Sequence, residues 1–271
     1  MSREARSRVA ALPIAFAFWW GIATPAGAQA SAFSFDSSRV PVGHAFEYVK
    51  SNRDGTHRTQ VTVYVAALDR VESLKWDSGA DAATLVAATM DWERFCVRGF
   101  ESRRLRRHAP EVMQGSLTTD TARRAIRVSF LPDSEIAVGV WPWHSYDFDF
   151  ASLGAALPHL VDPQAGFVFQ RMDVVYSGDE VGFADLGPVE VAYEQRERRD
   201  GRDSRRYRIG GPGLLRMAGL LWADARDGTL VEYELPVPDE PGFVDGRLRL
   251  TNTLQLGPAD WEAYKKARIA H

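Results

Sequence analysis

Apolar and polar residues alternate with a period of two along much of this chain, and that pattern constrains the fold more than any other feature. The clearest run is residues 247–256, RLRLTNTLQL. One face of this run would carry Leu248, Leu250, Asn252, Leu254 and Leu256. Successive side chains point to opposite faces of a strand, so the run predicts a strand with one buried and one solvated face, as in antiparallel sheets. Residues Val61 to Ala67 are apolar on both faces, which predicts a central strand.

Short turn sequences separate the alternating runs. Asn52–Gly55, Asp200–Gly201 and Asp227–Gly228 each lie between two such runs. Gly and Asp tolerate the positive φ of tight turns, so these segments predict β-hairpins. The pattern predicts about ten strands joined mostly as hairpins, rather than parallel βαβ units. No glycine-rich phosphate loop of the Rossmann or P-loop kind occurs in the sequence.

Residues 1–30 have the pattern of a secretory signal peptide. Three arginines precede an apolar stretch, VAALPIAFAFWWGIA at 9–23, and two small-residue cleavage sites follow at 26–28 and 28–30. The stretch is shorter than the ~20 residues that span a bilayer, and Pro13 interrupts it. The sequence therefore predicts a periplasmic or secreted mature chain with no stable membrane anchor, and leaves the choice of cleavage site open.

Charge and cysteine content limit the function classes. The leader carries three Arg and one Glu, so its removal lowers the net charge from −3 to −5. This acidity argues against a nucleic-acid-binding protein. Cys96 is the single cysteine and forms no disulfide within the chain. Its neighbours Phe95 and Val97 favour a small buried core residue over a catalytic nucleophile.

We expect residues 31–271 to form a single β-rich domain, with two β halves joined by a connection at 132–167. Two helices are predicted. Leu153, Ala156, Leu157 and Leu160 follow helical spacing, with Asp149 as the N-cap and Pro158 near the end. The second helix is predicted over Pro258–Arg268, with proline first, acidic residues early and basic residues late.

The segment from Val189 to Leu256 resembles periplasmic lipoprotein-carrier-type proteins of the LolA/LolB group and related secreted domains. The resemblance rests on the charged strands and on residues 220–234, LLWADARDGTLVEYE, where a Trp-x-Asp strand, a Gly turn and a return strand with acidic residues follow one another. It covers about a quarter of the chain and transfers no functional residue. It implies a mainly β fold, a strongly curved antiparallel sheet or half-open barrel with one or two covering helices. It also implies an apolar concave face for a lipid or other amphipathic small molecule.

The stretch WPWHSYDFDF at 141–150 contains the candidate site residues. As a hydrolase, it would use His144 as base, Asp147 or Asp149 to orient it, and Ser145 or Ser152 as nucleophile. However, an extended backbone would point His144 and Asp147 to opposite faces, and no Gly-x-Ser-x-Gly turn is present.

One His and two Asp could bind a divalent ion, but zinc sites normally carry more His or Cys. The sequence therefore assigns no catalytic residue, metal or cofactor. The aromatic side chains alone would anchor a helix over the sheet, or they would line a pocket whose polar head contact is His144. For the pocket reading, the candidate ligand-binding residues are Trp141, Trp143, His144, Tyr146, Asp147 and Asp149.

Three functions remain from the sequence. The favoured hypothesis is a non-enzymatic protein that binds or carries a hydrophobic or amphipathic ligand. The alternatives are a secreted hydrolase that uses His144 and an envelope interaction module that buries the aromatic stretch against a partner. Ligand identity, pathway and oligomeric state are not specified.

Overall fold

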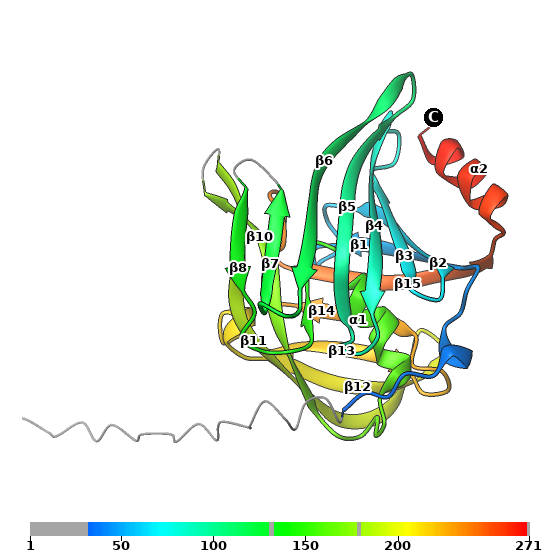
Figure 1. The fold of residues 1–271 in the computed structure, drawn as a ribbon. Helices are drawn as coiled ribbons and strands as arrows, with labels where there is room; N and C mark the ends of the chain where they lie inside the picture. Colours follow the sequence, from blue (N-terminus) through cyan, green and yellow to red (C-terminus); the bar gives the residue numbers. More distant parts are fainter. Residues whose placement is uncertain (1–31, 130–132, 178–179, 270–271) are drawn as a thin grey trace, which may run out of the picture.

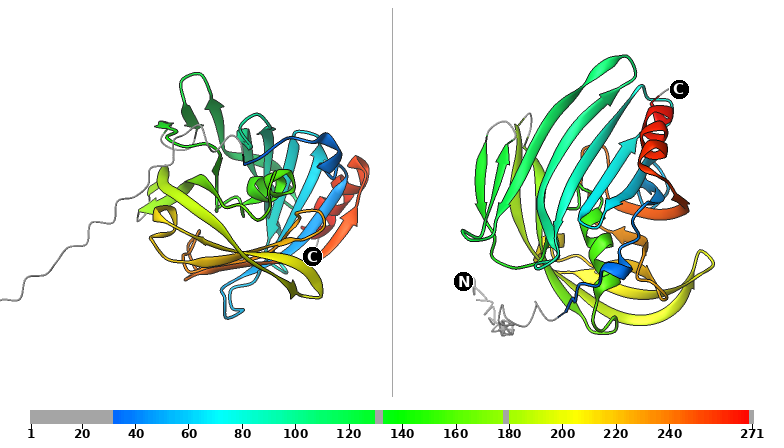
Figure 2. Two further views of the ribbon diagram at one scale, coloured as in Figure 1. Left: turned by 90° about the horizontal axis from the view of Figure 1, so that it is seen from below. Right: turned by 45° about the vertical axis from the view of Figure 1, so that its right-hand side comes forward.

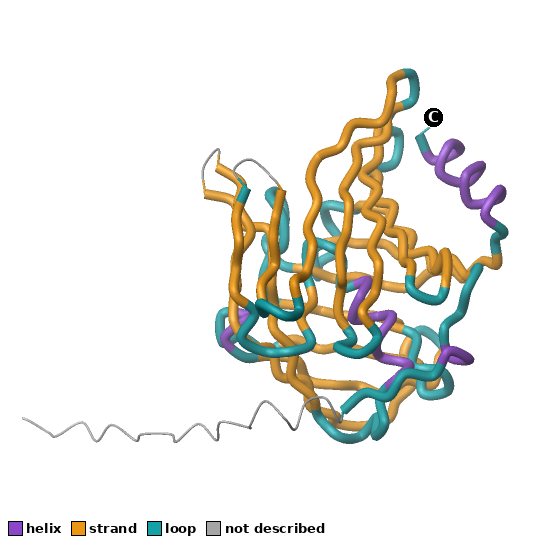
Figure 3. Tube along the Cα trace, viewed as in Figure 1, coloured by secondary structure: helices purple, strands orange, loops and turns teal. Residues whose placement is uncertain are grey.

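The computed structural model describes residues 32–129, 133–177 and 180–269. The predicted signal peptide lies outside these residues. Strands dominate the fold (Figure 3). In the first half of the chain the strands are β1 His44–Ser51, β2 Thr59–Ala67, β3 Arg70–Trp76, β4 Ala82–Asp91, β5 Cys96–Arg106, β6 Ala109–Asp120, β7 Ala125–Ser129 and β8 Ser134–Ala137.

The second half contains the remaining strands and both α-helices. The strands are β9 Trp143–His144, β10 Phe167–Ser177, β11 Glu180–Arg199, β12 Arg202–Gly210, β13 Gly219–Asp224, β14 Leu230–Leu235 and β15 Gly246–Gln255. The helices are α1 Ala151–Ala156 and α2 Pro258–Arg268. Short 3-10 helices are η1 Ser37–Arg39, η2 Leu157–His159 and η3 Pro212–Leu214. Within the described ranges, no helix has the length and apolar character needed to cross a membrane.

All fifteen strands of the described residues form one sheet, ordered β8-β7-β6-β5-β4-β3-β2-β1-β15-β14-β13-β12-β11-β10-β9. Two antiparallel meanders, β1–β8 and β10–β15, are joined where β1 pairs with β15. The sheet is strongly curved and not closed, and α1 lies within its concave side (Figures 1 and 2). The predicted fold class is confirmed, although the sequence pattern indicated about ten strands rather than fifteen.

The predicted hairpin turns are confirmed. Residues 52–58 connect β1 to β2, Asp200–Gly201 connects β11 to β12, and Asp227–Gly228 lies between β13 and β14. Asp200 and Gly201 both have positive φ, 47° and 78°, as a tight hairpin turn requires. The apolar strand at Val61–Ala67 is central as predicted, because β2 lies between β1 and β3.

The prediction that the leucines of residues 248–256 share one face is wrong. A β-bulge interrupts the pairing of β1 with β15, because Glu47 pairs with Asn252 while Tyr48 pairs with Leu250. Thr251 is the extra residue, and an extra residue reverses the facing of everything beyond it. The two parts of β15 therefore face different cores: Leu248 and Leu250 pack on the side of α1, and Leu254 and Leu256 pack on the side of α2.

Helix α2 has the predicted bounds, but it covers the convex face of the sheet rather than its open side. Trp261 is buried and stacks on Tyr64 of β2 at 4.7 Å between ring centroids. Its Nε1 donates to Glu72 of β3 at 2.7 Å. Val63, one residue before Tyr64, faces the opposite core that contains α1. The two helices thus pack on opposite faces of the same strands.

Helix α1 is shorter than predicted and begins differently. It spans Ala151–Ala156 and continues as η2, so Pro158 ends the α-helical part. The prediction that Asp149 is the N-cap is wrong: Phe150 occupies that position, and no side chain caps the helix. Asp149 and Phe150 both have φ of 51°, and the Asp149 carboxylate points to lysines of the sheet instead.

Candidate functional site

Strand β9 and the turn that follows it place the 141–150 stretch inside the concave face. β9 pairs in parallel with β10, with Trp143 opposite Gln170 and His144 opposite Arg171. The turn is then held by the buried carboxylate of Asp173 on β10. This carboxylate accepts hydrogen bonds from Ser145 Oγ at 2.8 Å and from the backbone N–H groups of residues 146 and 147 at 3.1 and 2.9 Å. Arg171 Nε donates to the same carboxylate at 2.7 Å, which compensates its burial.

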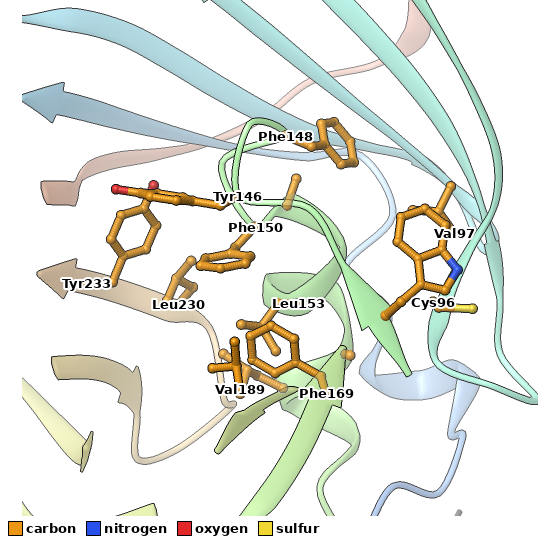
Figure 4. Close-up of a cluster of buried hydrophobic side chains, with 14 of the residues drawn as sticks. Cys96, Val97, Tyr146, Phe148, Phe150, Leu153, Phe169, Val189, Leu230 and Tyr233 are labelled. Atoms are coloured by element: carbon orange, nitrogen blue, oxygen red, sulfur yellow. The ribbon is translucent and has the colours of Figure 1, made fainter. Parts of the chain in front are cut away.

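The aromatic residues of the stretch build a compact buried cluster (Figure 4). Tyr146 stacks on Phe150 at 5.1 Å, and both rings meet the edge of Tyr233 from β14. Phe148 packs near Phe100 of β5. These contacts join both meanders through residues of the one short turn that precedes α1.

His144 lies in the core and contacts neither aspartate of its own stretch among the described residues. Its Nδ1 is 2.9 Å from Ser152 Oγ, and its ring packs against Phe169. Burial lowers the pKa of His144 to about 3, because the charged imidazolium would be desolvated. The imidazole is therefore neutral at physiological pH. Both side chains of the His144–Ser152 pair are fully buried, and no carboxylate of the described residues hydrogen-bonds to the imidazole. The pair as described therefore lacks the access and the third group of a hydrolase triad.

Two lysines and three carboxylates form a buried lysine–carboxylate cluster where the turn meets the sheet. Lys50 Nζ is 3.1 Å from Asp149 Oδ1 and 3.1 Å from Glu240 Oε1, and it also contacts Asp239 Oδ2. Lys75 Nζ is 3.4 Å from Asp149 Oδ2 and 3.4 Å from Glu240 Oε2. The lysines come from β1 and β3, whereas the carboxylates come from the turn before α1 and the loop between β14 and β15.

Burial and the neighbouring charges together set the protonation states of Lys50 in this cluster and of Asp147 beside it. Burial alone would lower the pKa of Lys50, but attraction to Asp149, Asp239 and Glu240 outweighs it and holds that pKa well above its usual value. Burial raises the pKa of Asp147 to about 7, and the nearby Lys75 only partly opposes that rise. Lys50 is thus charged throughout the physiological range, whereas Asp147 changes its charge near neutral pH.

An apolar slot lies between α1 and the concave face. Its cavity volume is about 50 Å³. The α1 side of the slot consists of the small residues Ala151, Gly154 and Ala155, followed by Pro158. Opposite them stand side chains of β1, β2, β3, β14 and β15, namely Phe46, Tyr48, Val63, Val65, Val71, Leu230 and Leu248. Asp149 also lines the slot, which connects it to the lysine–carboxylate cluster.

The structure distributes the six predicted ligand-binding residues over different environments. Trp143, His144 and Tyr146 are buried in the core, and Trp141 is partly buried with Arg94 5.9 Å from its ring centroid. Asp147 lies beside the cluster, and Asp149 is the one of the six that lines the slot. Cys96 is fully buried, as predicted for a core residue, and burial raises the pKa of its thiol.

Sequence reasoning missed the lysines and the carboxylates of the β14–β15 loop. A signal was present, because Phe46, Tyr48 and Lys50 are two residues apart and point to the same face of β1. The two aromatic side chains mark that face as the buried one, and a charged residue on a buried face is expected to be paired. No group of three or more His, Cys, Asp or Glu side chains in the described ranges is placed to hold a metal ion.

No family model and no curated protein matches this chain. Among solved structures, it is similar to a domain from Vibrio parahaemolyticus described as an outer membrane lipoprotein-sorting protein. The TM-score is 0.24 and the identity 9%, over 91% of this chain and 100% of that one. That description belongs to the group of the predicted resemblance, and no residue or ligand is transferred from it.

Proposed function

We propose that this protein binds the apolar part of a hydrophobic or amphipathic small molecule between α1 and the concave face of the sheet. The observation that carries the proposal is the apolar slot. Small residues on the α1 side leave space against valine, leucine and aromatic side chains of the sheet. Each methylene buried in such a slot contributes about 0.8 kcal/mol to binding. The predicted leader would deliver this binding protein to the periplasm or outside the cell.

The size of the slot limits what enters it. A cavity of roughly 150 Å³ is large enough to hold benzene. A cavity of about 50 Å³ therefore admits only the end of an apolar chain while α1 stays in place. A longer chain requires α1 to move away from the sheet. α1 has only six residues and no side-chain cap, so what holds it in place is the burial of Leu153 and Ala156 and the ion pairs of Asp149 at its start.

A slot-filling substitution tests the proposal. Protein purified without denaturant is examined by native mass spectrometry for bound lipid, and by fluorescence titration with the apolar probe N-phenyl-1-naphthylamine. The Ala155→Leu variant adds methylenes inside the slot, so we expect its dissociation constant for the probe to rise about tenfold. The matched control, Ala267→Leu, lies on the exposed side of α2 and should leave binding unchanged.

Circular dichroism and thermal melting establish that both variants fold. Equal probe binding by Ala155→Leu and the parent protein would overturn the assignment of the slot. Absence of both bound lipid and probe binding in the parent protein would refute the binding function itself.

A further inference from the structure

A wide polar vestibule adjoins the outer end of the apolar slot. Its volume is about 790 Å³. Val40, Pro41 and Pro158 line both the vestibule and the slot, so the two spaces meet at these residues. The vestibule is lined by residues of η1, of the end of η2 and of the turn that joins β13 to β14. A molecule with its apolar end in the slot would therefore have its other end in this vestibule.

Three arginines from separate parts of the chain line the vestibule. Arg39 comes from η1, Arg205 from β12 and Arg226 from the turn after β13, whereas Asp227 is the one acidic residue of the lining. The lining thus carries an excess of positive charge. The chain as a whole has the opposite sign, with a net charge of −3. A local excess of this kind attracts anions.

The arginines retain capacity for a ligand. Arg226 is exposed, and among the described residues its hydrogen bonding is limited to the backbone N–H, which donates to the Asp224 carboxylate at 2.8 Å, so its guanidinium has no partner there. Arg205 donates to the backbone carbonyls of Asp224 and Ala225, which position its side chain without neutralising it. Arg39 donates to the carbonyl of Pro158 at 2.9 Å and lies 3.4 Å from the carboxylate of Asp36, so part of its charge is already compensated.

The opposite end of the slot offers no comparable positive charge. Asp149 lines it there, and its two carboxylate oxygens already face Lys50 and Lys75. An amphipathic molecule in these two spaces would therefore lie in one direction, with its apolar chain inward and its head group in the vestibule. Guanidinium groups form charge-assisted hydrogen bonds to carboxylate and phosphate oxygens, and these are stronger than bonds to neutral heads.

From this arrangement we infer that the ligand is a single-chain amphiphile with an anionic head group, held by Arg205 and Arg226. This inference rests on the proposed binding function and adds the ligand class. The anionic head can be a carboxylate, as in a fatty acid, or a phosphate, as in a lipid fragment. Both present the same oxygen acceptors to the arginines.

A series of ligands with one chain and different heads tests this. Isothermal titration of the full protein compares decanoate, decyl phosphate, decyl maltoside and decyltrimethylammonium, with inorganic phosphate as the head alone. We expect the two anionic amphiphiles to bind about tenfold more tightly than the maltoside, and the cation to bind most weakly. Anionic binding should weaken as salt rises, because salt screens exposed charges. A higher affinity for one of the two anions identifies the head group.

Two variants assign the effect to the vestibule. Arg226→Gln and Arg205→Gln should each lose most of the preference for anionic heads and keep the affinity for decyl maltoside. Arg107→Gln, in the β5–β6 turn and outside both spaces, is the matched control and should keep the preference. Equal binding of anionic and neutral amphiphiles would overturn this inference and leave the proposed function standing. If none of the amphiphiles binds, both fail. If inorganic phosphate binds as tightly as decyl phosphate, the decyl chain of the ligand takes no part in binding.

Discussion

Replacing Lys50 by methionine should destabilise the protein more than any surface substitution. Met preserves most of the side-chain volume but removes the positive charge. Lys50 is fully buried and contacts Asp149, Asp239 and Glu240, so its loss leaves three carboxylates facing only Lys75. Removing one partner of a buried ion pair typically costs about 3–5 kcal/mol, because the remaining charge is desolvated without compensation. In a domain of this size, that loss lowers Tm by roughly 6–20 °C.

The assay is urea unfolding followed by circular dichroism, with Lys266→Met on the exposed side of α2 as the control, which should change stability by less than about 0.5 kcal/mol. The Lys50→Met variant also has a pH signature. Without Lys50, the pKa of Asp239, already raised by burial, rises further, and the pKa of Glu240 loses an attraction that lowers it. The folded state therefore takes up protons as pH falls. The difference in unfolding free energy between the parent protein and the variant should therefore become smaller as pH falls from 7 to 4. A deficit below about 1 kcal/mol, or one that does not depend on pH, would refute the reasoning.

Two further predictions concern the turn and its neighbours. Gly246→Ala would place a Cβ 1.6 Å from the Tyr146 hydroxyl, so it should cost about 3 kcal/mol in urea unfolding, whereas Gly139→Ala meets no atom within 4 Å and should be nearly neutral. The folded-state pKa of His144, about 3, is below its unfolded value of 6.5, so its contribution to stability is lost as pH falls below 6.5. For Asp147 the folded pKa, about 7, is above the unfolded value, so its contribution is lost as pH rises from about 4 to 7. His144→Gln should thus remove a loss of stability in acid, measured by thermal melts from pH 4 to 8, and an unchanged pH profile would count against the buried neutral imidazole.

Features with a local cause were predictable from the sequence. The Asp200–Gly201 turn requires only two residues that tolerate positive φ, and the structure gives both that conformation. Helix α2 follows from Pro258 at its start and the order of charges along it, and its bounds agree. The antiparallel sheet follows from the period-two runs and short turns, whereas its strong curvature was implied only by the resemblance to lipoprotein-carrier-type proteins. Each of these signals lies within a few neighbouring residues.

Features set by pairing between distant strands were not predictable in this way. The bulge at Thr251 depends on the register of β15 against β1, which are far apart in sequence, and it reverses the facing of Leu254 and Leu256.

Strand β6, Ala109–Asp120, has a largely exposed first half, so it lacks the apolar alternation by which strands are recognised. The number of strands was therefore underestimated.

The role of Asp149 shows why the candidate site itself escaped sequence reasoning. An aspartate before a helical pattern is a favourable N-cap when only local forces act. Here Lys50 and Lys75, brought in by β1 and β3, attract its carboxylate more strongly than the helix amides can. The competing partners lie about 70 to 100 residues earlier in the chain. Lys50, on the same face of β1 as Phe46 and Tyr48, was the available signal, but the pattern alone does not say which carboxylates it meets.

The lysine–carboxylate cluster also fixes the position of α1 against the sheet. Buried ion pairs can often be replaced by apolar residues without loss of stability, so such a cluster is weak evidence that stability is what it provides. Asp149 and Phe150 both adopt left-handed backbone conformations, which cost about 1–2 kcal/mol each for non-glycine residues. The ion pairs of Asp149 fix this unfavourable turn at the point where α1 begins. Because α1 forms one wall of the slot, these charges set the distance between that wall and the sheet, and with it the volume open to an apolar chain.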